Sequence, residues 1–158
     1  MKPLPKNRLF VWLNGKVMFI ANLLQKIPAK TTPPAFRLMQ IGSLFWQSRA
    51  LYVATRLGLA DAIGDGQKNT REIASELELS EDHLYRLLRM LGSMGIFEEV
   101  SPRVFRNNPT SSFLRLDNPQ NVRAMILMHN SPEMTKPWME SLEACIRDGC
   151  VPFEKVHG

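Results

Sequence analysis

The stretch TREIASELELSEDHLYRLLRMLGSMGIFEEVSPRVF, residues 70–105, decides the fold of this chain. It contains two helical segments, and Thr70 and Ser80 stand where their hydroxyls would cap the first turn of each. In the second segment the apolar residues recur at the helical period and form one stripe, which consists of Leu84, Leu87, Leu88, Leu91 and Met94. Gly95 is expected to end this helix, because glycine adopts the left-handed C-terminal conformation without steric penalty.

A hairpin is expected to follow the second helix directly. Ile96, Phe97 and Val100 favour a strand, residues 101–103 a turn, and residues 104–106 a returning strand. Helix, turn, helix and hairpin together are typical of a winged helix. The predicted fold is therefore mainly α, a winged-helix domain (helix-turn-helix plus β-hairpin wing) with long N-terminal dimerisation helices.

The longest helix is predicted between Thr32, as its N-cap, and Gly58, which stops it. Its apolar residues cover more than one face, so one small domain cannot bury them all. The second face therefore predicts a partner helix, from another copy of the chain or from a missing domain. The candidate dimer-interface residues are Leu38, Ile41, Leu44, Phe45, Trp46, Leu51 and Tyr52.

The positive charge of this chain is concentrated at its N-terminal end. The net charge is +5, yet residues 1–60 carry nine Lys and Arg and no Asp or Glu. Residues 1–30 are predicted to be a basic helical extension that packs on a partner subunit, with contact to a membrane surface as the alternative. Asn14, Gly15 and Lys16 interrupt its apolar run, which argues against a membrane span or a signal peptide.

The sequence shows few residue patterns that could form a catalytic, nucleotide-binding or metal-binding site. No glycine pattern suits a nucleotide, and His83, His129 and His157 have no partners at metal spacing. Cys145 and Cys150 match neither a redox nor a zinc motif, so they are expected to be free thiols. No catalytic, cofactor-binding or metal residue is predicted, and the chain alone is not expected to be a catalyst.

A winged-helix regulator that binds DNA is the alternative function. In such proteins the start of the second helix enters the major groove. Here that end carries Glu78, Glu81 and Asp82, and carboxylates oppose the phosphate contacts that dominate DNA affinity. Arg86, Arg89, Arg103 and Arg106 are the available cations. DNA contact is therefore disfavoured, although the fold alone leaves this class open.

Several segments, taken in order, resemble the N-terminal dimerisation domain of S-adenosylmethionine-dependent O-methyltransferases, such as caffeate-type, bacterial polyketide and carotenoid enzymes. They are LFWQSRALYVATRLGLADAI (44–63), LYRLLRMLGSMGIF (84–97), FRNNPTSSFLRL (105–116), NVRAMILM (121–128), Trp138, and FEKVHG (153–158). The resemblance covers about residues 36–158. It implies domain boundaries of 1–30 for the extension and 31–158 for the winged-helix dimerisation domain.

The resemblance implies a function for the chain within a longer parent protein. The chain would dimerise with its twin and form a lid over a small-molecule acceptor, without being catalytic on its own. A Rossmann-like catalytic domain is expected downstream and would bind S-adenosylmethionine for methyl transfer to a hydroxyl. If nothing follows Gly158, a noncatalytic adaptor is the third candidate. The expected location is the cytoplasm, with membrane-surface contact left open.

The resemblance also supplies candidate substrate-lining residues, which are Met125, Met128, Trp138 and Phe153. The first three lie in segments that approach the acceptor in this family, and Phe153 lies in the segment that leads to the catalytic domain. Flexible thioethers and an indole suit a flat, apolar acceptor. An ordinary role in the core is the competing interpretation for these four residues.

Overall fold

The computed structural model describes Lys16 and residues 32–158, and these residues divide into two compact units between Leu44 and Phe45. The predicted extension over residues 1–30, its packing on a partner and its membrane contact lie outside the described residues, apart from the exposed Lys16. The boundary between residues 30 and 31 therefore stays a prediction.

Helix α2 (Pro34–Leu57) is the predicted long helix. It begins at Pro34, one residue later than expected, and ends where Gly58 takes a φ of 71°. Residues 34–44 leave their large apolar side chains exposed, namely Phe36, Leu38, Met39, Ile41 and Leu44. Within the second unit, Ala50, Ala54 and Thr55 are buried, so that stretch of the helix packs on the winged-helix core.

A three-stranded antiparallel sheet, in the order β1-β3-β2, forms the wing. Strands β2 (Phe97–Ser101) and β3 (Val104–Asn107) are the predicted hairpin, and Arg103 in its turn has a φ of 65°. Strand β1 (Gln67–Asn69) was not predicted, because its three polar residues show no alternation of apolar side chains. It follows α3 (Leu59–Ile63) and pairs with β3.

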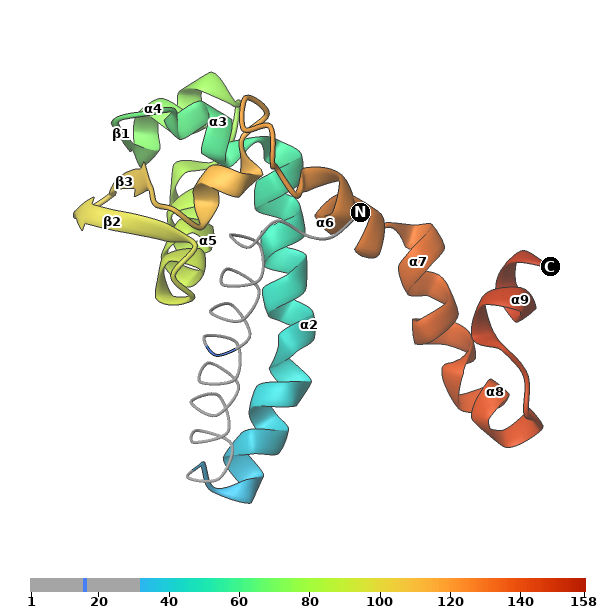
Figure 1. Cartoon of the computed structure of the whole chain (residues 1–158). Coiled ribbons are helices and arrows are strands. Elements are labelled where there is room, and N and C mark those ends of the chain that lie inside the picture. The colour runs from blue at the N-terminus through green and yellow to red at the C-terminus, as the bar shows by residue number, and fades with distance from the viewer. Residues whose placement is uncertain (1–15, 17–31) are drawn as a thin grey trace. The chain divides into compact units, whose positions relative to one another are not determined.

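The two helices of the helix-turn-helix are α4 (Thr70–Glu76) and α5 (Glu81–Ser93), beside the sheet (Figure 1). The prediction that Thr70 caps α4 is wrong. Asn69 Oδ1 accepts from Arg71 N at 2.9 Å, Glu72 accepts from Asn69 N at 2.9 Å, and Thr70 is buried. The chain prefers this cap because both side chains satisfy an otherwise unpaired amide.

Ser80 does occupy the N-cap position of α5, but its hydroxyl makes no capping hydrogen bond. Instead Ser80 Oγ lies 2.9 Å from Nδ1 of the exposed His83. At the other end, α5 finishes at Ser93, and Gly95 has the expected left-handed conformation, with a φ of 74°. The helix boundary was therefore predicted correctly, although the cap contact was not.

The winged-helix core closes around the predicted stripe of α5. Leu84, Leu88 and Leu91 are buried and pack with side chains from α3, α4, β2 and β3, which include Leu59, Ile73, Phe97 and Phe105. Leu87 is only half-buried and Met94 is exposed, so the buried part of the stripe is narrower than predicted. Tyr85 meets Phe105 edge-on, with ring centroids 6.2 Å apart.

Short helical segments follow the wing. They are η1 (Ser111–Leu114), α6 (Arg123–His129), α7 (Pro132–Lys136), the π-helical turn η2 (Pro137–Ser141), α8 (Leu142–Asp148) and α9 (Pro152–His157). The sequence also predicts helix starts at Asn118 and Pro119 and again at Ser131 and Pro132, each an N-cap residue followed by proline. The first is wrong, because Asn118 Oδ1 accepts from Gln120 N in a turn and α6 begins at Arg123. The second is confirmed, because Ser131 caps α7 by accepting from Met134 N. Helix α9 was not predicted.

The expectation of free thiols is also wrong, because Cys145 and Cys150 form a disulfide. Helix α8 ends at Gly149, whose φ of 72° turns the chain back. The amides of Gly149 and Cys150 both donate to the carbonyl of Cys145, at 2.8 and 3.1 Å. This turn brings the two Cα atoms within 4.5 Å, a proximity that linear spacing cannot reveal.

Candidate functional site

A groove runs between α2 and the α7–η2 segment. Two adjoining hollows of about 430 and 370 Å³ form it, and both are lined by Phe45, Thr135 and Met139. The α2–η2 groove is completed by side chains from both hollows, which are Arg49, Tyr52, Arg56, His129, Asn130, Pro132, Met134, Lys136, Trp138 and Glu140. All of these residues belong to the second compact unit.

One end of the groove is apolar. Trp138 is 61% exposed, Met139 is 68% exposed, and Met134 and Phe45 lie on the same hollow. The Pro137 ring is buried at the start of η2, and the wider π-helical turn follows it. Exposed aromatic and thioether side chains gathered around a hollow are suited to covering a flat apolar molecule.

The other end is polar and is organised by Asn130, which is only 7% exposed. Ser48 Oγ donates to Asn130 Oδ1 at 3.1 Å, and Arg49 donates to the Asn130 carbonyl at 2.7 Å. Arg49 also stacks on Tyr52, with its guanidinium carbon 4.5 Å from the ring centroid. These contacts fix the α6–α7 junction against α2 and hold the Arg49 guanidinium in one orientation.

The structure brings one predicted substrate-lining residue, Trp138, into the groove. Met125 and Met128 lie on α6 and are exposed, but they do not line it. Phe153 lies on α9 and contacts the His157 ring, with centroids 4.6 Å apart. For all four residues the role in substrate contact stays a prediction.

Sequence reasoning missed Arg49, Asn130 and Lys136. Asn130 stands just before Ser131 and Pro132, so its sequence context indicated only the start of a helix. Its main partner lies 81 residues earlier in the chain, and no local period or motif predicts that contact. The basic bias of residues 1–60 was the only available signal for Arg49.

Of the seven candidate dimer residues, five are exposed, and these are Leu38, Ile41, Leu44, Phe45 and Trp46. Phe45 and Trp46 contact each other edge-on at 4.9 Å. Leu51 packs against the winged-helix core, and Tyr52 is covered by Arg49. These five exposed side chains give α2 the uncovered apolar surface that a dimer interface needs, while the pairing of two copies stays a prediction.

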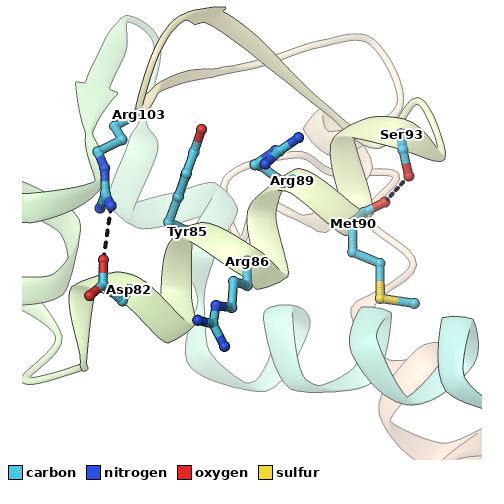
Figure 2. A pocket seen from close by; sticks show the side chains of 7 residues that line it. All are labelled: Asp82, Tyr85, Arg86, Arg89, Met90, Ser93 and Arg103. Atoms are coloured by element: carbon cyan, nitrogen blue, oxygen red, sulfur yellow. Dashed lines mark hydrogen bonds and ion pairs between the residues drawn. The ribbon is translucent and has the colours of Figure 1, made fainter.

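Figure 2 shows a hollow on α5, the helix that would enter the major groove in a DNA-binding regulator, lined by Asp82, Tyr85, Arg86, Arg89, Met90, Ser93 and Arg103. Arg103 points to Asp82, with which it forms a 2.9 Å ion pair, and also contacts Glu81 at 3.1 Å. Arg103 and Arg89 lie over Tyr85, at 4.6 and 5.6 Å from its centroid.

The cations of the wing are thus neutralised by carboxylates of the same unit. The hydrogen bond and charge of Arg103 lower the pKa of Asp82. Arg106 contacts both oxygens of Glu98, at 2.9 and 2.7 Å, and its hydrogen bonds lower the pKa of that carboxyl. Arg103 and Arg106, occupied in this way, offer little to phosphate, which leaves Arg86 and Arg89 as the other cations of α5 and makes this surface less suited to DNA.

A second set of charges fastens the loop before α6. Asp61 on α3 accepts from Leu116 N at 2.7 Å and pairs with Arg123 at 3.0 Å. Arg123 also donates to the Leu114 carbonyl at 2.9 Å. Arg115 pairs with Asp65 and Asp117, and these hydrogen bonds raise its pKa. These contacts position the start of α6, the helix whose last residue, His129, lines the groove.

Among the described residues, Lys16 and 32–158, no group of three or more His, Cys, Asp or Glu side chains is arranged to hold a metal ion. None of the helices in that part of the chain has the length and apolarity needed to cross a bilayer.

Comparison with known proteins gives one consistent set of similarities. Residues 39–116 match the family described as the O-methyltransferase dimerisation domain. The chain is 32% identical over 130 residues to phenazine O-methyltransferase PhzM of Lysobacter antibioticus, and 35% identical over 124 residues to a phenazine-1-carboxylate N-methyltransferase of Pseudomonas aeruginosa. These alignments cover 82% and 78% of this chain.

The fold has solved counterparts. The crystal structure of LaPhzM superimposes with a TM-score of 0.73 at 31% identity, over 80% of this chain and 38% of that one. The chain likewise spans 38% and 36% of the two curated relatives, so it corresponds to a part of those proteins. The relatives give no support for a DNA-binding regulator.

Proposed function

We propose, because residues 39–116 match the O-methyltransferase dimerisation domain family, that this chain is the dimerisation and substrate-lid part of a small-molecule methyltransferase. The homologues are S-adenosylmethionine-dependent methyltransferases. The proposed activity of the whole protein is methyl transfer to a hydroxyl of the acceptor.

The observation that carries the dimerisation half of this proposal is the exposed apolar face of α2. Leu38 is 71% exposed and Trp46 is 64% exposed. Further along the same helix, Ala50 and Ala54 are buried in the winged-helix core. Exposed apolar side chains of this kind are characteristic of protein interfaces. A second copy of the chain is the proposed partner, since a self-complementary face generates a closed two-fold dimer.

The lid half of the proposal rests on the α2–η2 groove. Its exposed Trp138 and Met139 are ready to cover an acceptor without themselves supplying an acid, a base or a nucleophile. We assign S-adenosylmethionine binding and the chemical step to the part of the relatives' length that this chain does not span. Met125, Met128 and Phe153 are proposed to contact the acceptor only when that part is present.

Light scattering of the chain across a micromolar concentration series tests the dimerisation proposal. We expect twice the mass of the 18.0 kDa chain, with dissociation on dilution. A strict monomer at the highest soluble concentration would contradict the proposal. Calorimetry with S-adenosylmethionine is the companion measurement, and measurable binding by this chain alone would contradict the assignment of the cofactor to the remaining part.

A further inference from the structure

We propose that the α2–η2 groove selects an aromatic acceptor that carries an acidic substituent, with the ring on the apolar end and the carboxylate at Arg49, Arg56 and Lys136. This inference rests on the proposed lid function and adds the charge of the substrate to it. It follows from how the two ends of the groove differ in chemistry.

The polar end has an excess of positive charge. Arg49, Arg56 and Lys136 line it, against the single carboxylate of Glu140. Within the described residues, none of these three cations forms an ion pair with an acidic side chain, whereas Arg103, Arg106, Arg115 and Arg123 all do. The groove therefore presents cations that the chain has left available for an outside anion.

Arg49 is prepared for such a contact. Its Nη1 donates to the Asn130 carbonyl at 2.7 Å, and its guanidinium is stacked on Tyr52. An arginine carries five N–H donors, so further donors remain for a carboxylate. Because the side chain is already ordered, binding an anion costs less conformational entropy than it would at a mobile cation.

Arg56 and Lys136 extend the positive end along two elements. Arg56 lies on α2, where its Nη1 is 3.4 Å from the Tyr52 hydroxyl, and Lys136 is the exposed last residue of α7. Glu140 follows Lys136 by four residues and competes for it. A ligand carboxylate between the two elements would reach cations from both sides.

The apolar end fits the rest of such a molecule. Phe45, Trp138 and Met139 surround a hollow that continues into the polar one through shared lining residues. A planar ring gains contact with an indole and a flexible thioether, and neither demands a particular substitution pattern. The positive charge at the polar end then determines which ring systems bind, because it favours those that carry an acidic group.

Equilibrium dialysis of the full chain with two matched probes tests this inference. Phenazine-1-carboxylate carries the charge, and phenazine-1-carboxamide has the same ring and size without it. We expect the acid to bind about fivefold more tightly, the factor that corresponds to an exposed ion pair of about 1 kcal/mol. The preference should shrink as salt is added, because exposed charges are screened.

Substitutions locate the effect. Lys136→Met and Arg56→Met should each reduce the preference for the acid, and Glu140→Gln should increase it. Arg86→Met is the matched control, since Arg86 is an exposed cation that lines the separate hollow of Figure 2. Arg49 is left unchanged, because its removal would also unpair the buried Asn130.

The outcomes separate the two proposals. Equal affinity for both probes would overturn the acidic-acceptor inference and leave the lid intact. A preference for the acid that Arg86→Met lowers as much as Lys136→Met would place the anion elsewhere and also overturn it. If neither probe bound, the acidic-acceptor inference would fail, because the groove lies wholly within this chain, while the lid function, which needs the rest of the protein, and the dimer measured by light scattering would stand.

Discussion

The winged-helix core and the helices that follow it use similar side chains in opposite ways. In the core, Phe105, Leu88 and Ile73 are fully buried and the cluster is closed on itself. In α6 to α9, Met125, Trp138, Met139 and Ile146 are each more than half exposed. The core is complete within one chain, whereas the later helices and the outer face of α2 keep apolar surface that one chain does not cover. The difference separates residues that hold the fold from residues left for partners.

The largest effect is expected from Phe105→Ala in the closed core. Loss of a fully buried ring leaves a cavity and should lower the free energy of unfolding by about 3–5 kcal/mol. Trp138→Ala is the matched control on the exposed side, and it should change that free energy by less than about 0.5 kcal/mol. Urea unfolding followed by circular dichroism measures both, and similar losses would remove the contrast between the two regions.

The next largest effect is expected at the uncovered face of α2. Ile41→Asp would place a carboxylate in the proposed dimer interface twice, once from each copy, and should weaken dimerisation by about 100-fold. Gln40→Asp adds the same charge at the neighbouring exposed position and controls for net charge. Sedimentation equilibrium gives both dissociation constants, and equal constants would mean that Ile41 faces solvent in the dimer.

An intermediate loss of stability is expected at the Asp61–Arg123 pair, which joins the core to the later helices. Asp61→Asn weakens the pair with Arg123 and should cost about 1–3 kcal/mol, because Arg123 is largely buried. Asp65→Asn is the control, since Asp65 is almost fully exposed although it also pairs with an arginine. Thermal unfolding distinguishes them, and the larger loss in Asp65→Asn would contradict this account of the joint.

The Cys145–Cys150 disulfide should matter only to the later helices. Opening this short loop is expected to cost about 2 kcal/mol locally, by the loop-entropy estimate. Hydrogen exchange after reduction should accelerate in α8 and α9 and stay unchanged in α5. Thiol titration without reductant should find none of the two cysteines free. Two free thiols would contradict the pairing.

The smallest effect is expected from the pH dependence of the wing. The pKa values of Asp82 and Glu98 are lowered in the folded chain by Arg103 and Arg106. Their contribution to stability is therefore present above the unfolded pKa, near 4, and is lost as the pH falls through the lower folded values. Melting temperatures should fall below about pH 4, and less steeply in Glu98→Gln; an unchanged slope would mean that the Arg106 pair contributes nothing.

Much of the fold could be predicted because its signals are local. The period of Leu84, Leu88 and Leu91, the glycine stops at Gly58 and Gly95, and the hairpin turn all act within a few residues. The errors occurred where two local solutions compete. Asn69 with Glu72 caps α4 better than Thr70 does, and Asn118 satisfies a turn where a helix start was expected.

The candidate site could be predicted only in part. Trp138 was found through the family resemblance, but the contacts of Asn130 with Ser48 and Arg49 join segments more than 80 residues apart. The third strand, β1, exists because β3 offers it an edge, and its own residues favour no strand.

The sequence by itself determined the order of the long helix, the helix-turn-helix and the hairpin, the Leu84, Leu88 and Leu91 stripe that forms the core, and the surplus of apolar surface on α2. Periodicity and caps encode these features because they depend on neighbours in the chain. Only the tertiary structure decided that the wing arginines are held by Glu81, Asp82 and Glu98, that Cys145 meets Cys150, and that Arg49 and Lys136 share a groove with Trp138. Such contacts arise when the chain closes on itself, and their partners carry no mark of each other in the linear sequence.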